Sequence, residues 1–371
     1  MKQSRVPLAS MLQRIGYGIE HGFVLTLEGL TRVLGHFDPR IYSERQRIVS
    51  TTQGRLPRKS DKFFVLVLFL AEQVPEFTAN IIEAVGQSQF NLVIVSNTSL
   101  LPSVRAALRE KCLMLVERNN VGRDFGAYKD GIGLVSRLCG PVERLVIAND
   151  SMFYLRDGLA ALVSALDGPE DWIGVSEVFE FHYHVASFLM SFGRPVLESA
   201  AFRRFWSRYR PIGTRRWIIH QGEVKLSEQL VEAGFRPHIL YKGESLRPLL
   251  PGRPMQQIVT LLPAQVRARL APAAAGSSGD IGQASADAII SAILATNQMH
   301  AGGLLFQRLL GLPMIKRDVV YRRIHTIEEM QAALAAIEEP LRAEILADLR
   351  RRGTPDRLGF WRRLLQRHSA I

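Results

Sequence analysis

Five apolar segments of strand length, separated by stretches with helical spacing, constrain the fold of this chain more than any other feature. Each segment is apolar at consecutive positions, which is typical of a strand buried on both faces of a sheet. The apolar segments are 63–69, 92–97, 113–116, 144–150 and 172–176, and the helical patterns are 78–86, 103–111, 125–138 and 159–166. Strands that alternate with helices predict an α/β fold, with a mostly parallel sheet flanked by helices.

The remaining segments divide the 371 residues around that sheet. Residues 1–60 predict an N-terminal helical extension, and residues 61–270 hold the α/β core. Residues 271–286 are small and polar, which predicts a flexible loop. Residues 287–371 predict a C-terminal helical region that completes the site.

A formal net charge of +12 indicates either an anionic partner or a solvated, arginine-rich surface. The anionic partners are nucleic acid, a phosphorylated substrate or an acidic membrane face. Because basic residues are not interleaved with aromatics on a strand and zinc-finger spacing is absent, we expect no nucleic acid partner. The apolar spacing from Met11 to Leu34 fits a helix packed on the core, or an amphipathic helix on a partner or a membrane.

Cysteine usage and the lengths of the apolar runs favour the cytoplasm. The chain has two cysteines, Cys112 and Cys139, without metal-ligand spacing, which fits a reducing compartment. The N-terminus shows no apolar region of the signal-peptide type. The longest apolar run, 63–71, is too short to cross a bilayer. We expect a cytoplasmic protein, either soluble or peripheral to a membrane.

Polar residues follow three of the predicted strands, at the edge where open α/β sheets bind ligands. Asn97 ends the second strand, residues 119–124 follow the third, and residues 149–151 end the fourth. One such cluster is common at the end of any strand. Three on one edge predict a binding site.

The middle cluster marks a turn from strand to helix. Gly122 permits tight backbone geometry, and Asp124 is placed to cap a helix that begins near Phe125. Arg123 then stands at the edge of the site, where its guanidinium can reach a phosphate or a carboxylate. A plain connection with a capping aspartate explains Asp124 well but Arg123 poorly.

The third cluster, Asn149-Asp150-Ser151, is a candidate metal site. An acidic side chain after a buried strand can hold Mg²⁺ or Mn²⁺ and leave positions open for phosphate oxygens. Asp150 is the predicted ligand. The alternative is that Asp150 caps the next turn.

The order of these motifs resembles the core of GT-A-type glycosyltransferases and, more closely, the rhamnan synthesis protein F family of bacterial polysaccharide biosynthesis. The resemblance extends over about residues 60 to 320. The matching pieces are residues 120–128, 148–151, His184-x-x-Ser187-Phe188, Phe202-x-x-Phe205-Trp206, 223–227, 297–300 and 312–317. It implies a GT-A-like, Rossmann-like sheet with helical additions at both ends.

The resemblance also implies a function and its partners. A protein of this kind transfers a sugar from a nucleotide-sugar donor to a growing, lipid-linked cell-surface glycan of rhamnan or O-antigen type. Rhamnose is the sugar that the family name suggests. A lipid-linked acceptor would bring the protein to the inner face of the plasma membrane as a peripheral protein, where its basic patches would be attracted to anionic lipid.

Several residues receive roles from this resemblance. The donor contacts are Asn97, Asn120, Gly122, Arg123, Asp124, Asn149, Lys316 and Arg317. The divalent cation is expected on Asp150, with His300 as a second ligand because the Asn-Asp-Ser motif carries one carboxylate instead of two. A carboxylate must take the proton of the acceptor hydroxyl. Glu223 ranks first for that role and Glu177 is an alternative, with His184 as a further catalytic candidate.

The single carboxylate of the metal motif also motivates a rival function. A glycan- or nucleotide-binding protein of the same fold would keep the polar edge without catalysis. Donor turnover separates the two functions. A nucleic-acid-binding protein is a third option that rests on net charge alone.

Overall fold

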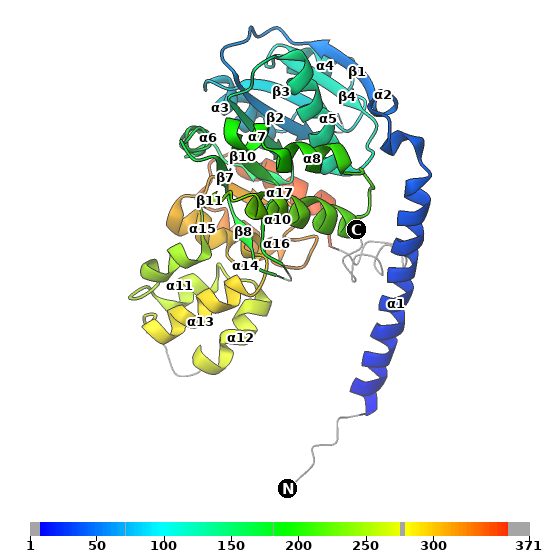
Figure 1. Cartoon of the computed structure of the whole chain (residues 1–371). Helices are drawn as coiled ribbons and strands as arrows, with labels where there is room; N and C mark the ends of the chain where they lie inside the picture. Colours follow the sequence, from blue (N-terminus) through cyan, green and yellow to red (C-terminus); the bar gives the residue numbers. More distant parts are fainter. Residues whose placement is uncertain (1–7, 71, 181, 275–278, 355–371) are drawn as a thin grey trace.

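An eight-stranded sheet forms the centre of the computed structural model, which describes residues 8–70, 72–180, 182–274 and 279–354 (Figure 1). The strand order is β1-β4-β3-β2-β5-β10-β7-β11. All of these strands run in one direction except β1 and β10, so the sheet is mostly parallel, as the sequence predicts. The strands are β1 (Ile48–Gln53), β2 (Lys62–Leu68), β3 (Asn91–Ser96), β4 (Met114–Arg118), β5 (Arg144–Asn149), β7 (Trp172–Gly174), β10 (Leu189–Gly193) and β11 (His238–Ile239).

The continuous apolar segments arise because the central strands are covered on both faces. In β2, Phe64 and Leu66 join one hydrophobic cluster, whereas Phe63 and Val65 join another on the opposite face. The first cluster includes residues of α3 (Glu76–Gly86), α4 (Pro102–Arg109) and α6 (Leu159–Ala165). The second includes residues of α5 (Arg123–Leu138), α7 (Arg194–Glu198), α8 (Ala200–Arg208) and α10 (Lys225–Glu232).

Three strands of the sheet, β1, β10 and β11, are not among those that the sequence predicts, and β11 pairs parallel with β7. β1 lies in the region predicted to be a helical extension, and it pairs antiparallel with β4 at the sheet edge. Its burial alternates between half-buried and exposed, so it shows no continuous apolar run. β10 inserts between β5 and β7 and runs antiparallel to both.

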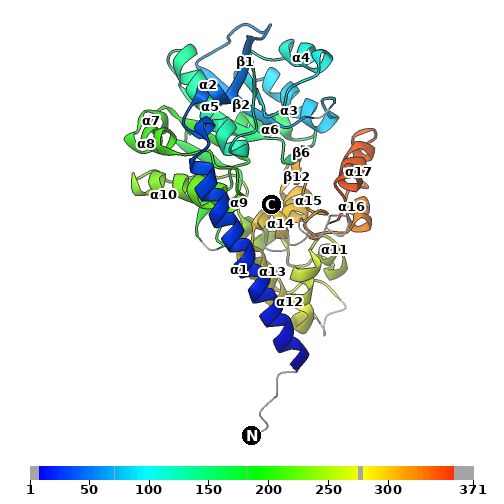
Figure 2. The ribbon, with the colours of Figure 1, turned by 90° about the vertical axis from the view of Figure 1, so that its right-hand side faces the viewer.

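The C-terminal region packs against the core through a third hydrophobic cluster. This cluster joins Phe77 and Phe153 to Leu304, Ile315 and Leu349. Its elements include β6 (Met152–Tyr154), which pairs antiparallel with β12 (Met314–Lys316). The α-helices that follow β11 in the chain are α11 (Met255–Val259), α12 (Ala264–Ala274), α13 (Gln283–Leu294), α14 (Gln298–Ala301), α15 (Gly303–Leu310), α16 (Ile327–Ala333) and α17 (Leu341–Arg352). In Figure 2, α16 and α17 lie on one side of the molecule and α8 and α10 on the other.

The loop predicted over 271–286 is shorter than expected. Helix α12 continues to Ala274, and α13 begins at Gln283. Alanine has the highest helix propensity, so the alanines at each end of this stretch extend the flanking helices. Residues 275–278 lie outside the described residues.

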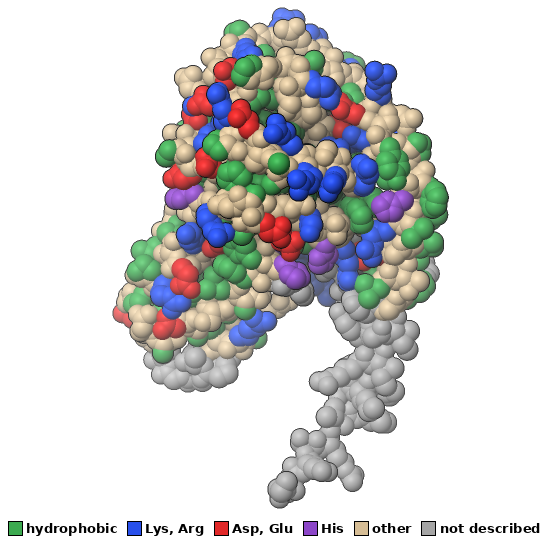
Figure 3. All heavy atoms as spheres, in the orientation of Figure 1, with side chains coloured by type: hydrophobic (Ala, Val, Ile, Leu, Met, Phe, Trp, Pro, Cys, Tyr) green, Lys and Arg blue, Asp and Glu red, His purple; other side chains and the backbone are tan. Residues whose placement is uncertain are grey.

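Helix α1 (Leu8–His36) runs away from the body (Figure 1). Near its end it is held by Arg216, whose Nε lies 3.0 Å from Glu28 Oε2, and by an edge contact between His36 and Trp217. Apolar side chains along this helix stay exposed, among them Leu30 and Leu34, and Figure 3 shows hydrophobic side chains along it. None of the described helices has both the length and the apolar character needed to cross a membrane.

Candidate functional site

Two of the predicted polar clusters meet at the carboxyl end of β5. Asn149, the last residue of β5, is buried, and its Nδ2 donates to Asp124 Oδ2 at 3.0 Å. The backbone N–H of Ser151 donates to Asn149 Oδ1 at 3.0 Å. The side chain of Asn149 therefore joins the start of α5 to the Asn-Asp-Ser turn.

Asp124 does not cap α5, contrary to the prediction. The N-cap position is Gly122, and the helix begins at Arg123. Because the helix starts earlier than expected, Asp124 lies in its first turn and its carboxylate accepts from Asn149 instead of from a backbone N–H of α5.

The backbone before α5 explains the glycine and shows strain at the arginine. Gly122 has a φ of +76°, and a Cβ there would lie 2.3 Å from Pro211 Cβ, so only glycine fits. Arg123 has a φ of +49°, a left-handed conformation that costs an L-residue roughly 1–2 kcal/mol. Strained residues of this kind cluster at functional sites.

The surroundings of Asp124 disfavour its negative charge. Burial raises the pKa of Asp124 to about 7, and the charges of Asp150 and Glu223 add to the effect, whereas Lys316 and Arg123 oppose it. The predicted donor residues Asp124, Arg123 and Lys316 therefore lie within electrostatic reach of one another.

Glu223 has two partners in the segment that precedes β10. Its Oε1 accepts from the hydroxyl of Ser187, and its Oε2 lies 3.7 Å from Nε2 of His184. The other ring nitrogen of His184 lies 2.8 Å from the carbonyl oxygen of His182. The two predicted catalytic residues Glu223 and His184 are thus brought together. Ser187 belongs to the motif His184-x-x-Ser187-Phe188, but the sequence indicates no catalytic role for it.

The turn that carries Glu223 is packed directly on α5. A π-helical segment, Ile218–Val224, precedes α10, and π-helical turns are frequent at functional sites. A Cβ on Gly222 would lie 2.9 Å from the ring of Phe125. This contact sets Glu223 beside the first turn of α5 and hence close to Asp124.

Glu177, the alternative base, lies in a different setting. It belongs to the short strand β8 (Glu177–Val178), which pairs with β9 (His184–Val185). Burial raises its pKa, whereas a hydrogen bond with Tyr183 and the charge of Lys242 lower it. These partners are not shared with Asp124, so the structure favours Glu223 as the member of the site.

The predicted metal ligands are engaged by other side chains. Asp150 Oδ2 accepts from the N–H of Phe69 at 3.1 Å and lies 3.3 Å from Arg317 Nη1. Nε2 of His300 lies 2.8 Å from Oδ1 of Asp318. Among the described residues, no three His, Cys, Asp or Glu side chains are grouped as metal ligands. The described residues therefore do not fit the proposed Asp150–His300 metal site, and a divalent cation stays a prediction.

Arg317 is a buried link between segments and is not presented to a diphosphate. Its Nη1 donates to the carbonyl oxygen of Asp150 at 2.6 Å, and its Nη2 to Asp348 at 3.1 Å. The guanidinium carbon lies 4.8 Å from the ring centre of Phe77 and 5.7 Å from that of Phe153. We therefore assign this predicted donor contact to the packing of the C-terminal region.

Lys316, the neighbour of Arg317, does face the site. Its Nζ lies 5.2 Å from the ring centre of Phe188. Its charge also acts on Asp318: although burial opposes the shift, His300, Lys316 and Arg215 hold the pKa of Asp318 below its usual range. In the sequence, Arg215 is one of several arginines of a basic patch expected to be attracted to anionic lipid, and nothing in its surroundings distinguishes it from its neighbours.

The two remaining predicted donor residues, Asn97 and Asn120, lie behind or outside the cluster around Asp124. The amide oxygen of Asn97 accepts from the buried Arg118, which also donates to the carbonyl oxygen of Val121 at 2.7 Å. Asn97 thus supports the loop that precedes α5. Asn120 is exposed on that loop.

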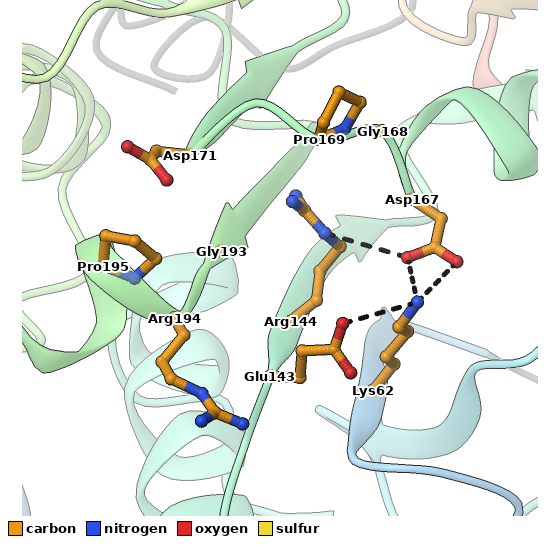
Figure 4. A pocket seen from close by; sticks show the side chains of 10 residues that line it. All are labelled: Lys62, Glu143, Arg144, Asp167, Gly168, Pro169, Asp171, Gly193, Arg194 and Pro195. Atoms are coloured by element: carbon orange, nitrogen blue, oxygen red, sulfur yellow. Dashed lines mark hydrogen bonds and ion pairs between the residues drawn. The ribbon is translucent and has the colours of Figure 1, made fainter.

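A hollow of about 260 Å³ lies at the opposite, amino-terminal end of the parallel strands (Figure 4). Its buried and half-buried charged side chains are paired within its own wall, whereas Asp171 and Arg194 in the same lining are exposed. Lys62 Nζ lies 2.9 Å from Asp167 and 3.7 Å from Glu143, and Arg144 Nε lies 3.8 Å from Asp167. This hollow offers less unmatched charge to a ligand than the carboxyl end of the sheet does.

Part of the chain is similar to a known protein family and to several known proteins. Residues 92–248 match the family described as rhamnan synthesis protein F. A relative from Sinorhizobium fredii, "Uncharacterized protein y4gN", is 28% identical over 200 residues, which are 53% of this chain and 52% of the relative. "Virulence protein VirA" of Vibrio anguillarum is 29% identical over 138 residues, 36% of this chain and 44% of that protein. The chain thus spans about half the length of these curated relatives.

A solved structure from Desulfovibrio desulfuricans, titled a "putative nucleotide-diphospho-sugar transferase", aligns with a TM-score of 0.29 and 11% identity. The alignment covers 49% of this chain and 80% of that one, and a likeness this weak carries no argument. The resemblance that the sequence motifs indicate is confirmed by the family match: residues 92–248 of this chain are similar to the rhamnan synthesis protein F family.

Proposed function

We propose that this protein is a glycosyltransferase of the hexosyltransferase class, which moves a sugar from a nucleotide-sugar donor to a cell-surface polysaccharide. The observation that carries the proposal is that Asn149, Asp124 and Glu223 come together at the carboxyl end of the sheet. All three lie in the residues that match the rhamnan synthesis protein F family. Rhamnose is the sugar that the family description suggests, and a rhamnan or O-antigen type glycan is the acceptor.

The proposed chemistry assigns one role to each part of the site. Glu223 takes the proton of the acceptor hydroxyl as the acceptor oxygen forms its bond to the anomeric carbon, and the bond from that carbon to the diphosphate breaks. Ser187 and His184 fix the orientation of the Glu223 carboxylate. Asp124, held by Asn149, shapes the donor pocket. Basic side chains offset the charge of the departing nucleoside diphosphate.

The lipid-linked acceptor and a peripheral position at the inner face of the plasma membrane belong to the same proposal. Helix α1 supports it, because Leu30 and Leu34 of the helix, and Phe37 just after its end, are exposed on a chain with a net charge of +12. The double variant Leu30→Ser/Leu34→Ser should bind anionic vesicles several-fold more weakly than the parent. If the double variant and the parent bound the vesicles equally, α1 would have no role in membrane binding.

A thermal-shift screen tests the donor part of the proposal. The full chain is heated with nucleoside diphosphates and nucleotide sugars, with and without Mg²⁺ or Mn²⁺, since a ligand of the folded state raises the melting temperature by mass action. We expect one nucleotide base to give a clear shift that is lost in Asp124→Ala and kept in the surface control Glu228→Ala. Asp150→Ala is a poor first variant, because Asp150 also pairs with Arg317.

The rival function is a non-catalytic glycan- or nucleotide-binding protein. The engagement of Asp150 by Arg317 and Phe69 favours it, because the motif then has no free carboxylate pair for a metal. A nucleotide sugar that binds but is never turned over, with any acceptor tested, would favour this rival over the transferase.

A further inference from the structure

We propose that the diphosphate of the donor is bound by Arg215 and Arg123, with Lys316 as a third contact, in place of a protein-held divalent cation. The inference rests on the proposed function, because it names the groups that would bind the donor in that same site.

The two arginines extend from neighbouring backbone segments. Gly122 packs against Pro211, and a Cβ added to Gly213 would lie 3.9 Å from the backbone nitrogen of Gly122. Arg123 directly follows Gly122, and Arg215 begins α9 (Arg215–Trp217), two residues after Gly213. Below this contact, Val121, Ile212 and Trp217 form a hydrophobic cluster, which fixes the two segments to each other.

Neither guanidinium is neutralised by an acid at contact distance in the described part of the chain. Arg123 and Arg215 form no ion pair there, whereas the next residue, Arg216, is paired with Glu28 at 3.0 Å. Nε of Arg215 is buried and has no hydrogen-bond partner among the described residues. A buried donor of this kind costs about 1–3 kcal/mol until a partner satisfies it.

The electrostatic effects are those of cations crowded together. Desolvation lowers the pKa of Arg123 and the charge of Arg215 lowers it further, whereas Asp124 opposes the shift. Lys316 acts on both Asp124 and Asp318, and Arg215 acts on Asp318 as well. Lys316 on β12 is therefore shared between Asp124, on which Arg123 acts, and Asp318, on which Arg215 acts.

This arrangement suits a diphosphate. A guanidinium donates two parallel hydrogen bonds to phosphate oxygens. Arg123 has a positive φ, and backbone strain of this kind clusters at functional sites. By contrast, the Asn-Asp-Ser turn offers little to a metal: Asp150 Oδ2 already has two partners, and the side chain of Asn149 is bonded at both ends.

Isothermal titration calorimetry of the full chain with inorganic pyrophosphate, and then with nucleoside diphosphates, tests the inference. Each titration is run in EDTA and again in Mg²⁺. We expect the dissociation constants under the two conditions to agree within about threefold. Arg215→Ala should weaken binding at least tenfold in EDTA, as expected when a charged hydrogen bond is lost. Arg215→Lys should recover part of that loss, and Arg216→Ala should bind like the parent.

The outcomes separate this inference from the proposed function. Binding that requires Mg²⁺ and is equal in Arg215→Ala and Arg216→Ala would overturn the arginine site and leave the transferase standing. No binding of pyrophosphate or any nucleoside diphosphate, with or without metal, would overturn both.

Discussion

Charged side chains lie at both ends of the parallel strands, but the two ends differ in how these charges are paired. At the amino end, the buried Arg144 and the half-buried Lys62 both pair with Asp167 in one wall (Figure 4). At the carboxyl end, Asp124 has its pKa raised to about 7, and Arg215 has an unpartnered buried Nε. The comparison teaches that charge alone does not mark the site. The site is marked by buried charge that the fold leaves without a partner.

Helix α5 shows the same contrast within one element. Asp130 is fully buried between Arg118, 2.9 Å away, and Arg47, whereas Asp124 is half-buried and accepts from the neutral amide of Asn149. The two aspartates lie on the same helix, so the difference comes from what surrounds each one.

The largest expected effect on stability is that of Asp130→Asn. Removing this carboxylate leaves two buried guanidiniums without their counter-charge, and breaking a buried ion pair typically costs 3–5 kcal/mol. Urea unfolding at pH 7.5 measures the loss, with Asp124→Asn as the matched variant on the same helix. A loss below about 1 kcal/mol for Asp130→Asn would show that the buried network does not carry the stability assigned to it.

A smaller effect of opposite sign is expected for Asp124→Asn. Because the folded-state pKa of Asp124 is raised to about 7 from an ordinary value of 3.8, ionisation costs stability as the pH rises through that window, and the full cost is present above pH 7. The asparagine variant should melt a few degrees above the parent at pH 8, and the gain should shrink towards pH 4. A gain that is the same at both pH values would exclude ionisation as its cause.

The smallest effect is expected at the amino end. Asp167→Asn removes a partly exposed partner of Lys62 and Arg144, and such pairs contribute at most about 1 kcal/mol. Nucleotide binding should be unchanged in this variant when measured beside Asp124→Ala. If Asp167→Asn lost nucleotide binding and Asp124→Ala kept it, the assignment of the two ends would have to be reversed.

The strands that sequence could predict are those buried on both faces. Phe63 to Leu68 is apolar at every position because both sides of β2 are covered. β1 was missed because it lies at the edge and packs on one side only. The place of β10 between β5 and β7 depends on pairing between distant segments, which no local pattern reports.

The site was predictable to the level of the sheet edge and no finer. The positions of Asp124 and Asn149 at the ends of two strands that follow one another in the chain, β4 and β5, indicated one edge of the sheet, and the two side chains meet there. Their direct contact depends on where α5 begins, and the expected cap at Asp124 was one such boundary error. Arg215 and Arg216 are alike in sequence, and only the fold, which brings Glu28 to Arg216, distinguishes the paired arginine from its neighbour.

The central claim is that the carboxyl end of the sheet is a sugar-transfer site with Glu223 as its base. The most direct measurement is the rate of nucleoside diphosphate release from the matching nucleotide sugar, with acceptor present, in the parent, Glu223→Gln and the surface control Glu228→Gln. The account predicts a loss of 100-fold or more in Glu223→Gln, as is typical when a general base is removed, with an unchanged melting temperature and a normal rate in the control. A Glu223→Gln protein that transfers sugar at the parent rate would contradict it.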